Sequence, residues 1–112
     1  LMPKIPNLVI DGVRKPKRAT LRRYGLSGAE WMAMLRSQGG VCAICSRVPS
    51  SGILCIDHEH VKKYKKMPPS ERKKYVRGLA CPHCNHRLLG FFITLDRVKQ
   101  VVQYLQRYEA RK

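Results

Sequence analysis

Two tight cysteine pairs constrain the fold of this 112-residue chain more than any other feature of its sequence. Cys42 and Cys45 form the first pair, Cys81 and Cys84 form the second, and both have the spacing Cys-x-x-Cys. A structural Zn²⁺ ion takes four thiolate or imidazole ligands in a tetrahedron, and one such pair supplies two of them from a single turn. Together the pairs predict one complete structural zinc site.

Disulfide or redox chemistry is the alternative role for these cysteines. The longest apolar run near the start of the chain, Leu8-Val9-Ile10, is too short for a signal peptide or a membrane span, so we expect a reducing, cytoplasmic location. In such a compartment paired cysteines usually bind metal. A chain of this size also has room for only one modest core, to which a metal adds stability. Cys55 has no partner at suitable spacing and is expected to be buried in a strand.

The stretch between the two pairs is unusually long. It spans 35 residues, against roughly 15 to 20 in common zinc modules. It contains a strand-like run that leads to Asp57, His58 and His60, and the second pair is followed at once by Asn85. A carboxylate and an amide oxygen suit Mg²⁺ or Mn²⁺, and an imidazole with a pKa near neutral can deprotonate water. These residues therefore predict a metal-dependent phosphodiesterase site.

A second zinc site is the competing interpretation of the histidines. It would use four residues: His58, His60, His83 and His86. A purely structural site rarely adjoins an aspartate and a polybasic loop, so the sequence favours the catalytic interpretation.

Net charge is +16 and is concentrated in two segments. Residues 1–26 carry +6 and residues 62–77 carry +7, on either side of the first cysteine pair and the Asp-His run. This distribution predicts a polyanionic partner, most commonly DNA, although a merely solvated loop is the alternative. No basic amphipathic helix accompanies either segment, so a membrane surface fits poorly. The expected DNA-binding residues are Lys62, Lys63, Lys65, Lys66, Arg72, Lys73, Lys74 and Arg77.

The chain is expected to form one domain over residues 21–112, preceded by a flexible basic arm over 1–20 that is rich in proline. Residues 61–75 are a basic insertion whose Tyr64 and Tyr75 are available for stacking on bases. An amphipathic helix is expected over about 95–109, with an apolar stripe that packs on the core or in part forms a dimer contact.

Two further helices are predicted from their end signals. Ser27 and Glu30 have the spacing of a capping box, which predicts a helix that ends at Gly39-Gly40 and buries Trp31, Met34 and Leu35. Cys81-Pro82 is typical of a helix start, and this second helix is expected to end near Gly90.

The ordered motifs resemble the recombination endonuclease VII group of the HNH, or ββα-metal, nucleases. The matching segments, in order, are Tyr24-Gly-Leu-Ser27, Gly39-Gly-Val-Cys-Ala-Ile-Cys45, Asp57-His-Glu-His60 and Val76-Arg-Gly-Leu-Ala-Cys-Pro-His-Cys-Asn85. The resemblance implies an α+β fold: a small zinc-stabilised ββα-metal (His-Me finger) core with flanking helices. It also suggests a phage origin and action in the host cytoplasm.

The resemblance also implies a role for each site residue. The four cysteines would bind zinc, Asp57 and Asn85 would hold the catalytic Mg²⁺ or Mn²⁺, and His58 would be the general base. His60 would contact the scissile phosphate or assist the metal. The implied activity is hydrolysis of DNA to a 5′-phosphate and a 3′-hydroxyl, with branched DNA such as a Holliday junction as substrate and a homodimer as the assembly.

Two alternatives to that activity remain open at the sequence level. One is an HNH nicking or homing nuclease that acts on linear duplex DNA. The other is a non-catalytic zinc-ribbon module that binds nucleic acid. Asp57 and Asn85 favour an enzyme, because a binding module has no need of an oxygen-ligand pair beside a histidine.

A regular strand would separate two of the expected catalytic residues. Successive side chains point to opposite faces, so Asp57 and His58 would diverge while His58 and His60 align. The strand is therefore expected to end or bend near Asp57.

Overall fold

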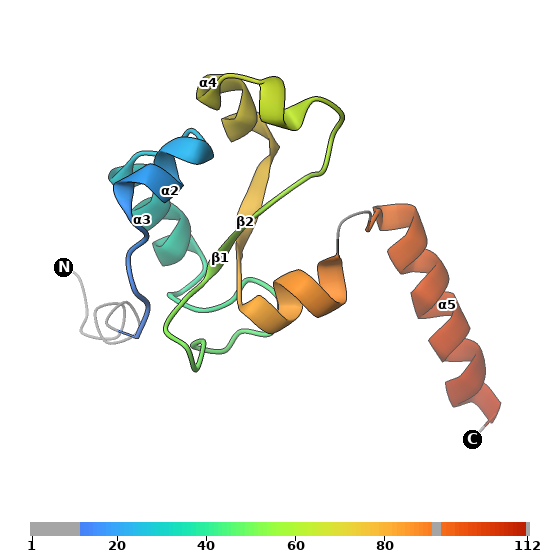
Figure 1. Ribbon diagram of the computed structural model, residues 1–112. Helices are drawn as coiled ribbons and strands as arrows, with labels where there is room; N and C mark the ends of the chain where they lie inside the picture. The colour runs from blue at the N-terminus through green and yellow to red at the C-terminus, as the bar shows by residue number, and fades with distance from the viewer. Residues whose placement is uncertain (1–11, 91–92, 112) are drawn as a thin grey trace.

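The computed structural model describes residues 12–90 and 93–111 as a small α+β arrangement built around one two-stranded sheet (Figure 1). The elements, in chain order, are α2 (Arg18–Arg23), α3 (Gly28–Ser37), β1 (Cys55–His58), η1 (Tyr64–Lys66), α4 (Pro69–Arg72), η2 (Lys73–Tyr75), β2 (Val76–Ala80), η3 (Cys84–Leu89) and α5 (Leu95–Arg111).

Strands β1 and β2 pair antiparallel, and their register is irregular next to the expected catalytic residues. Asp57 lies opposite Gly78, but His58 lies opposite Val76, so Arg77 is left over on β2. A bulge of this kind bends the strand and redirects side chains, which otherwise alternate between the two faces. The extra residue belongs to β2, so it is β2 that the bulge bends. Strand β1 itself ends at His58, which confirms the expectation that it ends or bends near Asp57.

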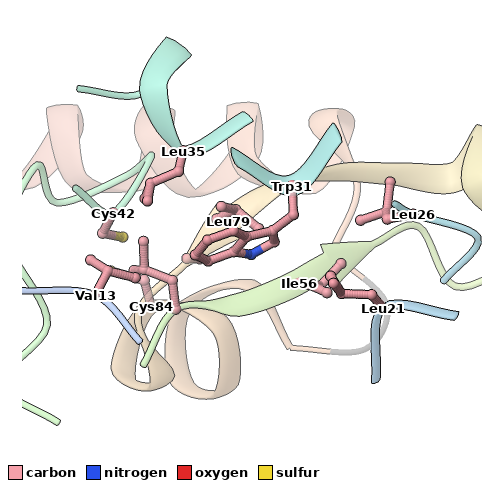
Figure 2. Close-up of a cluster of buried hydrophobic side chains, with 11 residues drawn as sticks. Val13, Leu21, Leu26, Trp31, Leu35, Cys42, Ile56, Leu79 and Cys84 are labelled. Atoms are coloured by element: carbon pink, nitrogen blue, oxygen red, sulfur yellow. The ribbon is translucent and has the colours of Figure 1, made fainter. Parts of the chain in front are cut away.

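The core lies between the sheet, α2, α3 and the cysteine loops (Figure 2). Trp31 and Leu35 from α3 and Leu79 from β2 are almost fully buried, and Met34 packs against them from a half-buried position. Two of the expected zinc ligands, Cys42 and Cys84, belong to the same buried cluster. The full cluster is Val13, Leu21, Leu26, Trp31, Leu35, Cys42, Leu54, Ile56, Leu79, Ala80 and Cys84.

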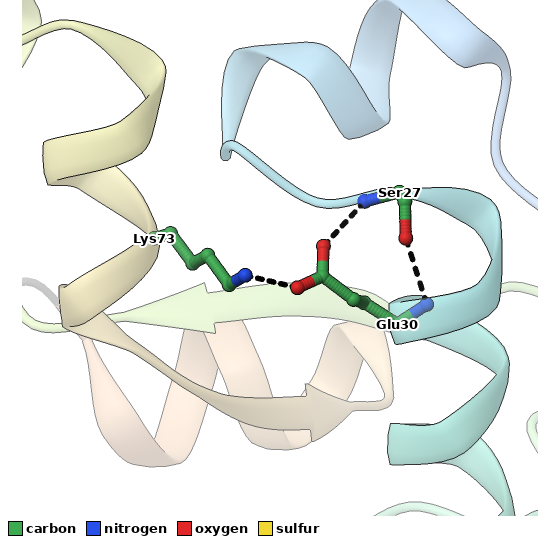
Figure 3. Close-up of polar contacts among 3 residues, drawn as sticks. All are labelled: Ser27, Glu30 and Lys73. Atoms are coloured by element: carbon green, nitrogen blue, oxygen red, sulfur yellow. Dashed lines mark hydrogen bonds and ion pairs between the residues drawn. The ribbon is translucent and has the colours of Figure 1, made fainter.

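Helix α3 begins with the predicted capping box. The Ser27 hydroxyl accepts a hydrogen bond from the Glu30 backbone N–H, and the Ser27 backbone N–H donates to the Glu30 carboxylate (Figure 3). The same carboxylate forms an ion pair with Lys73, which comes from the basic insertion. The start of α3 is thus also a contact point for the segment between the two strands.

Gln38, at the end of α3, ties that helix to β2. Its side chain accepts a hydrogen bond from the Leu79 N–H (2.9 Å) and donates to the Leu79 carbonyl (3.0 Å). A Cβ atom at Gly78 would lie 3.2 Å from the Gln38 amide oxygen, so glycine leaves room for this contact. The Gly-Leu sequence before the second cysteine pair therefore has a packing role.

The structure departs from the sequence-based expectations at both ends of the chain. Residues 1–11 of the expected basic arm lie outside the described residues, but Val13 is buried and α2 already begins at Arg18. The C-terminal helix α5 is present, yet none of its residues is buried, so the apolar stripe does not pack on the core as expected. In Figure 1 this helix stands apart from the other elements. No described helix combines the length and the apolar character that crossing a bilayer requires.

Candidate active site and metal centre

The four paired cysteines converge on one point. The Sγ atoms of Cys42, Cys45, Cys81 and Cys84 all lie within 4.8 Å of one another, and those of Cys45 and Cys81 are 3.9 Å apart. A tetrahedral zinc site with Zn–S bonds of ~2.3 Å separates its sulfur atoms by about 3.8 Å. The arrangement therefore fits a zinc ion, as the spacing of the cysteines predicts.

Backbone groups near Cys42 favour its thiolate form. Burial raises the pKa of the Cys42 thiol, but backbone N–H groups, including those of Cys81 (3.3 Å) and Ile44 (3.4 Å), donate to its sulfur and bring the pKa down to about 6. Burial and the neighbouring thiols raise the pKa of Cys84 to about 12. A coordinated zinc ion deprotonates such a thiol outright, so metal binding at this cluster releases protons.

The expected catalytic residues line one cavity of about 200 Å³. Asp57 and His58 reach it from β1, His60 from the residues just after β1, and Asn85 from η3. These two groups of residues are far apart in the sequence, and the antiparallel pairing of β1 with β2 brings them together. Cys81 and Cys84 of the cysteine cluster lie between the end of β2 and Asn85. Tyr24, Ile56, His86 and Gly90 complete the lining.

Aromatic rings surround His58. The Tyr64 ring stacks on the imidazole with centroids 4.2 Å apart and an interplanar angle of 18°. The His60 and Tyr24 rings lie at 4.5 Å and 5.6 Å in tilted arrangements. Burial lowers the pKa of the His58 imidazole, and the electrostatic effect of His60 lowers it further. The lowered pKa favours the neutral imidazole of His58, which is the form that can accept a proton.

Asp57 is buried and is bound to Arg77. Its Oδ2 accepts a hydrogen bond from Arg77 Nε at 2.7 Å, and its Oδ1 accepts one from a terminal guanidinium nitrogen at 3.1 Å. The bulge in β2 gives Arg77 its place in this contact. Arg77 was expected to bind DNA, whereas in this structure its guanidinium neutralises the carboxylate that is expected to hold the catalytic ion.

Asn85 is positioned by the second cysteine pair. Its backbone N–H donates to the Cys81 carbonyl at 2.8 Å, and its own carbonyl accepts from the Gly90 N–H at 3.3 Å. That second bond spans five residues, as in a π-helix, and such turns are frequent at functional sites. The expected helix from Pro82 to Gly90 is thus present, with its later turns wound as η3.

Cys55 connects the two sites. It lies half-buried on β1, where burial and the charge of Cys81 raise the pKa of its thiol while a hydrogen bond with the Asn85 side chain opposes that shift. Cys55 therefore contacts the expected ion ligand without belonging to the four-sulfur cluster.

The four-histidine zinc site considered from the sequence does not form. Within residues 12–90 and 93–111, the cysteine cluster is the only group of three or more potential ligands that converges as a metal site would. His83 lines a separate cavity, which it shares with Cys45 and Cys81. His86 instead lines the cavity that contains His58 and Asn85, a position that the sequence left open.

The basic insertion is folded against the domain, and its cations fall into three groups. Arg72 donates three hydrogen bonds to backbone carbonyls, so its guanidinium acts in the fold. Lys73 and Lys74 form exposed ion pairs with Glu30 and Glu71, which are weak contacts that a phosphate can replace. The remaining expected DNA-binding residues are exposed and form no ion pair with any described residue: Lys62, Lys63, Lys65 and Lys66.

A basic groove of about 540 Å³ runs beside the cavity that contains His58 and Asn85. Arg14, Lys15 and Lys17 line it, and it shares Asn85 and His86 with that cavity. The composition of residues 1–26 indicated that this segment is positively charged, but it could not show where the charge lies in the fold. The position of the segment depends on a distant partner, since the Arg14 backbone N–H donates to the Gly52 carbonyl at 2.6 Å.

A four-cysteine cluster that could hold a metal ion, together with a cavity lined by histidine, aspartate and asparagine, defines a small protein with a candidate hydrolytic site. Residues 17–107 match the family model described as recombination endonuclease VII. The chain belongs to this family of nucleases.

Two curated phage proteins are similar to the chain. It is 30% identical over 89 residues to the Gene 59 protein of Mycobacterium phage D29, covering 78% of this chain and 47% of that protein. It is 32% identical over 87 residues to the Gene 59 protein of Mycobacterium phage L5, covering 76% and 46% respectively. The chain thus spans about half the length of these relatives. No solved structure matches it.

Proposed function

We propose that this chain is a DNA endonuclease of the HNH, or ββα-metal, type that hydrolyses phosphodiester bonds with Mg²⁺ or Mn²⁺. The observation that carries the proposal is the cavity that brings Asp57, His58, His60 and Asn85 together beside the four-cysteine cluster. Membership of the endonuclease VII family supports the same reaction class.

In this proposal each residue has a separate task. His58 accepts the proton of the attacking water, and Asp57 and Asn85 hold the divalent ion through oxygen atoms. His60 contacts the scissile phosphate. When bound, the ion would stabilise the charge that develops on the phosphate and on the leaving oxygen. The products would be a 5′-phosphate and a 3′-hydroxyl.

The cysteine cluster takes no part in the reaction under this proposal. Its zinc ion would fix η3, which carries Asn85, against the sheet that carries His58. Such rigid support matters because a catalytic group that is misplaced by about 1 Å can lose on the order of 10² in rate.

The proposed substrate is branched DNA, with a Holliday junction as the type case. Lysines of the basic insertion and the groove lined by Arg14, Lys15 and Lys17 flank the cavity. Positive charge in both places is consistent with a DNA strand that lies across the site. Paired cuts in a junction require two active sites. We propose that the exposed apolar face of α5, which includes Val98, Val101 and Leu105, forms the contact of a homodimer.

Cleavage of a four-way junction and a matched linear duplex, each with and without Mg²⁺, tests the proposal. His58→Ala should lower the rate by on the order of 10² to 10⁴ and leave DNA binding intact. His83→Ala is the matched control, because His83 lies outside the cavity. Equal cutting of both substrates would favour a nicking or homing nuclease instead. Metal-independent binding without cutting of any DNA would favour a non-catalytic zinc-ribbon module.

If the proposal holds, the protein acts in the cytoplasm of a phage-infected host. That compartment contains DNA and is reducing, so the cysteines stay able to bind zinc. The phage relatives support this setting.

A further inference from the structure

The basic insertion places a tyrosine ring directly on the proposed general base. The Tyr64 and His58 rings are stacked, with centroids 4.2 Å apart and planes inclined by only 18°. From the sequence, Tyr64 was one of two tyrosines available for stacking on DNA bases. In the structure, one face of its ring is instead occupied by an imidazole of the protein itself.

The stacking restrains a torsion that is otherwise soft. Rotation about the last side-chain bond of a histidine has broad, roughly two-fold preferences, so the ring needs outside contacts to hold one orientation. His60 and Tyr24 meet the same imidazole, but at angles of 43° and 53°. Of these three rings, Tyr64 alone lies nearly parallel to the His58 imidazole and covers it face to face.

Arg72 holds Tyr64 in place. Its guanidinium donates to the Tyr64 carbonyl at 3.2 Å and to the Lys65 carbonyl at 2.8 Å, and its Cζ lies 5.5 Å from the centroid of the Tyr64 ring. A third bond, to the Arg23 carbonyl at 2.9 Å, fastens the segment to the end of α2. Tyr64 is therefore supported from both its backbone and its ring.

Close packing reinforces this attachment. A Cβ atom at Gly25 would lie only 2.1 Å from the Pro69 carbonyl oxygen, so the insertion approaches α2 and α3 more closely than any side chain at position 25 would allow. The ion pair between Lys73 and Glu30 lies on the same side of the insertion, beside α3 (Figure 3).

The Tyr64 hydroxyl contributes nothing visible to the contact. It is buried and has no hydrogen-bond partner among the described residues. The aromatic ring is thus the part of the side chain that touches His58. A phenylalanine at position 64 should therefore keep the contact.

We propose that Tyr64 is a positioning residue that holds the His58 imidazole in its catalytic orientation through ring stacking. The proposal rests on the proposed function, because it takes His58 as the general base. It gives the basic insertion a second task besides binding DNA phosphates.

Three variants test the proposal on the zinc-loaded full chain. Tyr64→Leu removes the ring, Tyr64→Phe keeps the ring without the hydroxyl, and Tyr75→Leu removes a tyrosine of the same segment whose ring meets Tyr64 edge-on at 6.5 Å. Zinc content and a thermal melt first establish that each variant is folded.

Proton NMR of the His58 ring at one fixed pH gives a readout that does not need activity. Protons over the face of an aromatic ring are shielded, so the His58 ring signals should move downfield in Tyr64→Leu and stay near the wild-type position in Tyr64→Phe. Unchanged signals in Tyr64→Leu would overturn the stacking.

Cleavage kinetics give the second readout. Tyr64→Leu should lower kcat by on the order of 10- to 100-fold with KM unchanged, as expected when a catalytic group loses its orientation. Tyr64→Phe should keep the wild-type kcat. An equal loss in Tyr64→Phe would assign the effect to the hydroxyl, and an equal loss in Tyr75→Leu would assign it to the fold of the segment; both would overturn the proposal. If wild type cuts no DNA, the proposed function fails, while the NMR result still decides whether Tyr64 orients His58.

Discussion

The Arg77 guanidinium donates two hydrogen bonds to the Asp57 carboxylate, of 2.7 Å to Oδ2 and 3.1 Å to Oδ1. Both carboxylate oxygens are therefore engaged by a fixed positive charge. Under the proposed function, a divalent ion at Asp57 would compete with Arg77 for these two oxygens.

Replacing Arg77 should make the fold depend more strongly on the divalent ion. Arg77→Gln leaves a buried carboxylate without its partner, so the free energy of unfolding in the absence of Mg²⁺ should fall by about 1–2 kcal/mol. This estimate is reduced from the full cost of breaking a buried ion pair because the Arg77 side chain is 37% exposed. Mg²⁺ should then stabilise the variant more than it stabilises wild type, as measured by denaturant unfolding.

Lys74→Gln is the control for that experiment. It breaks an exposed ion pair with Glu71 and should change the free energy of unfolding by less than about 0.5 kcal/mol, with or without Mg²⁺. Equal stabilisation of wild type and Arg77→Gln by Mg²⁺ would show that the ion and Arg77 do not compete.

Gly25 and Gly39 form a matched pair for testing how closely the insertion packs. Both have positive φ, at +75° and +72°, but a Cβ atom would meet the Pro69 backbone only at Gly25, and would meet nothing within 4 Å at Gly39. Gly39→Ala should therefore cost only the ~1–2 kcal/mol of the left-handed backbone conformation. Gly25→Ala should lower the free energy of unfolding by clearly more than Gly39→Ala does, because the new Cβ atom would clash with the Pro69 backbone, which cannot move aside as a side chain could. Thermal melts of the two variants, compared at equal zinc loading, check this; equal losses would mean that the insertion is not held against Gly25.

The sequence predicted features that depend on local spacing, and it missed those that depend on distant partners. Cysteine spacing predicted the four-sulfur cluster, and Ser27 with Glu30 predicted the start of α3, because each signal lies within a few residues. The contact between Arg77 and Asp57 depends on the register of two strands and on a bulge between them, which no local pattern specifies.

The expectation that α5 packs on the core was wrong, and the reason applies to any amphipathic helix. The spacing of apolar residues such as Val98 and Leu105 identifies an apolar face of a helix, but it does not say which surface covers that face. The stacking of Tyr64 on His58 was missed for a similar reason, since only the folded insertion brings the two rings together.

Zinc removal should unfold the domain. Zinc binding contributes on the order of 10–16 kcal/mol in small zinc-finger peptides, which is as large as the whole stability of a typical domain. Chelation, or Cys84→Ser, should therefore abolish the cooperative thermal transition seen by circular dichroism. Cys55→Ser should keep one zinc per chain, because Cys55 lies outside the cluster.

The pH dependence of zinc affinity follows from the same thiols. The pKa of Cys84 is raised to about 12 without metal, so its proton must leave when zinc binds. Zinc affinity should accordingly weaken as pH falls, measured by competition with a chromogenic chelator. An affinity that does not change with pH would mean that the cysteines are not bound as thiolates.

The rate of cleavage should report the lowered pKa of His58. Burial, and then the effect of His60, lower this pKa below the ordinary value of 6.5, and the base works in its neutral form. Single-turnover rates between about pH 5 and pH 8 should therefore be level on the alkaline side and fall about tenfold per pH unit below the pKa. In His60→Ala the fall should begin at higher pH, because one cause of the lowering is gone.

The same shift affects stability with a definite sign. Because the unfolded chain takes up a proton at His58 more readily than the folded one, the free energy of unfolding should decrease as pH falls below about 6.5. His58→Ala should lose this contribution. A pH profile of stability that is identical in the two proteins would mean that the imidazole is not desolvated in the fold.

The lysines of the insertion should control the salt dependence of DNA binding. Lys62, Lys63, Lys65 and Lys66 are exposed and form no ion pair with a described residue, so their ammonium groups are available for phosphates. Each phosphate contact contributes about −0.9 to the slope of log K against log salt concentration, so changing all four to Gln should flatten the slope by up to about 3–4. The control removes the same charge from α5, by changing Arg97, Lys99, Arg107 and Arg111 to Gln.

Filter binding of a catalytically inactive His58→Ala background at several salt concentrations provides the measurement. The insertion variant should bind junction and duplex more weakly by similar factors, because phosphate contacts carry no sequence information. An unchanged slope in the insertion variant, or an equal change in the α5 control, would mean that the insertion is not where the phosphate backbone lies. In that case the groove lined by Arg14, Lys15 and Lys17, which opens onto Asn85 and His86, would be the remaining path for the strand.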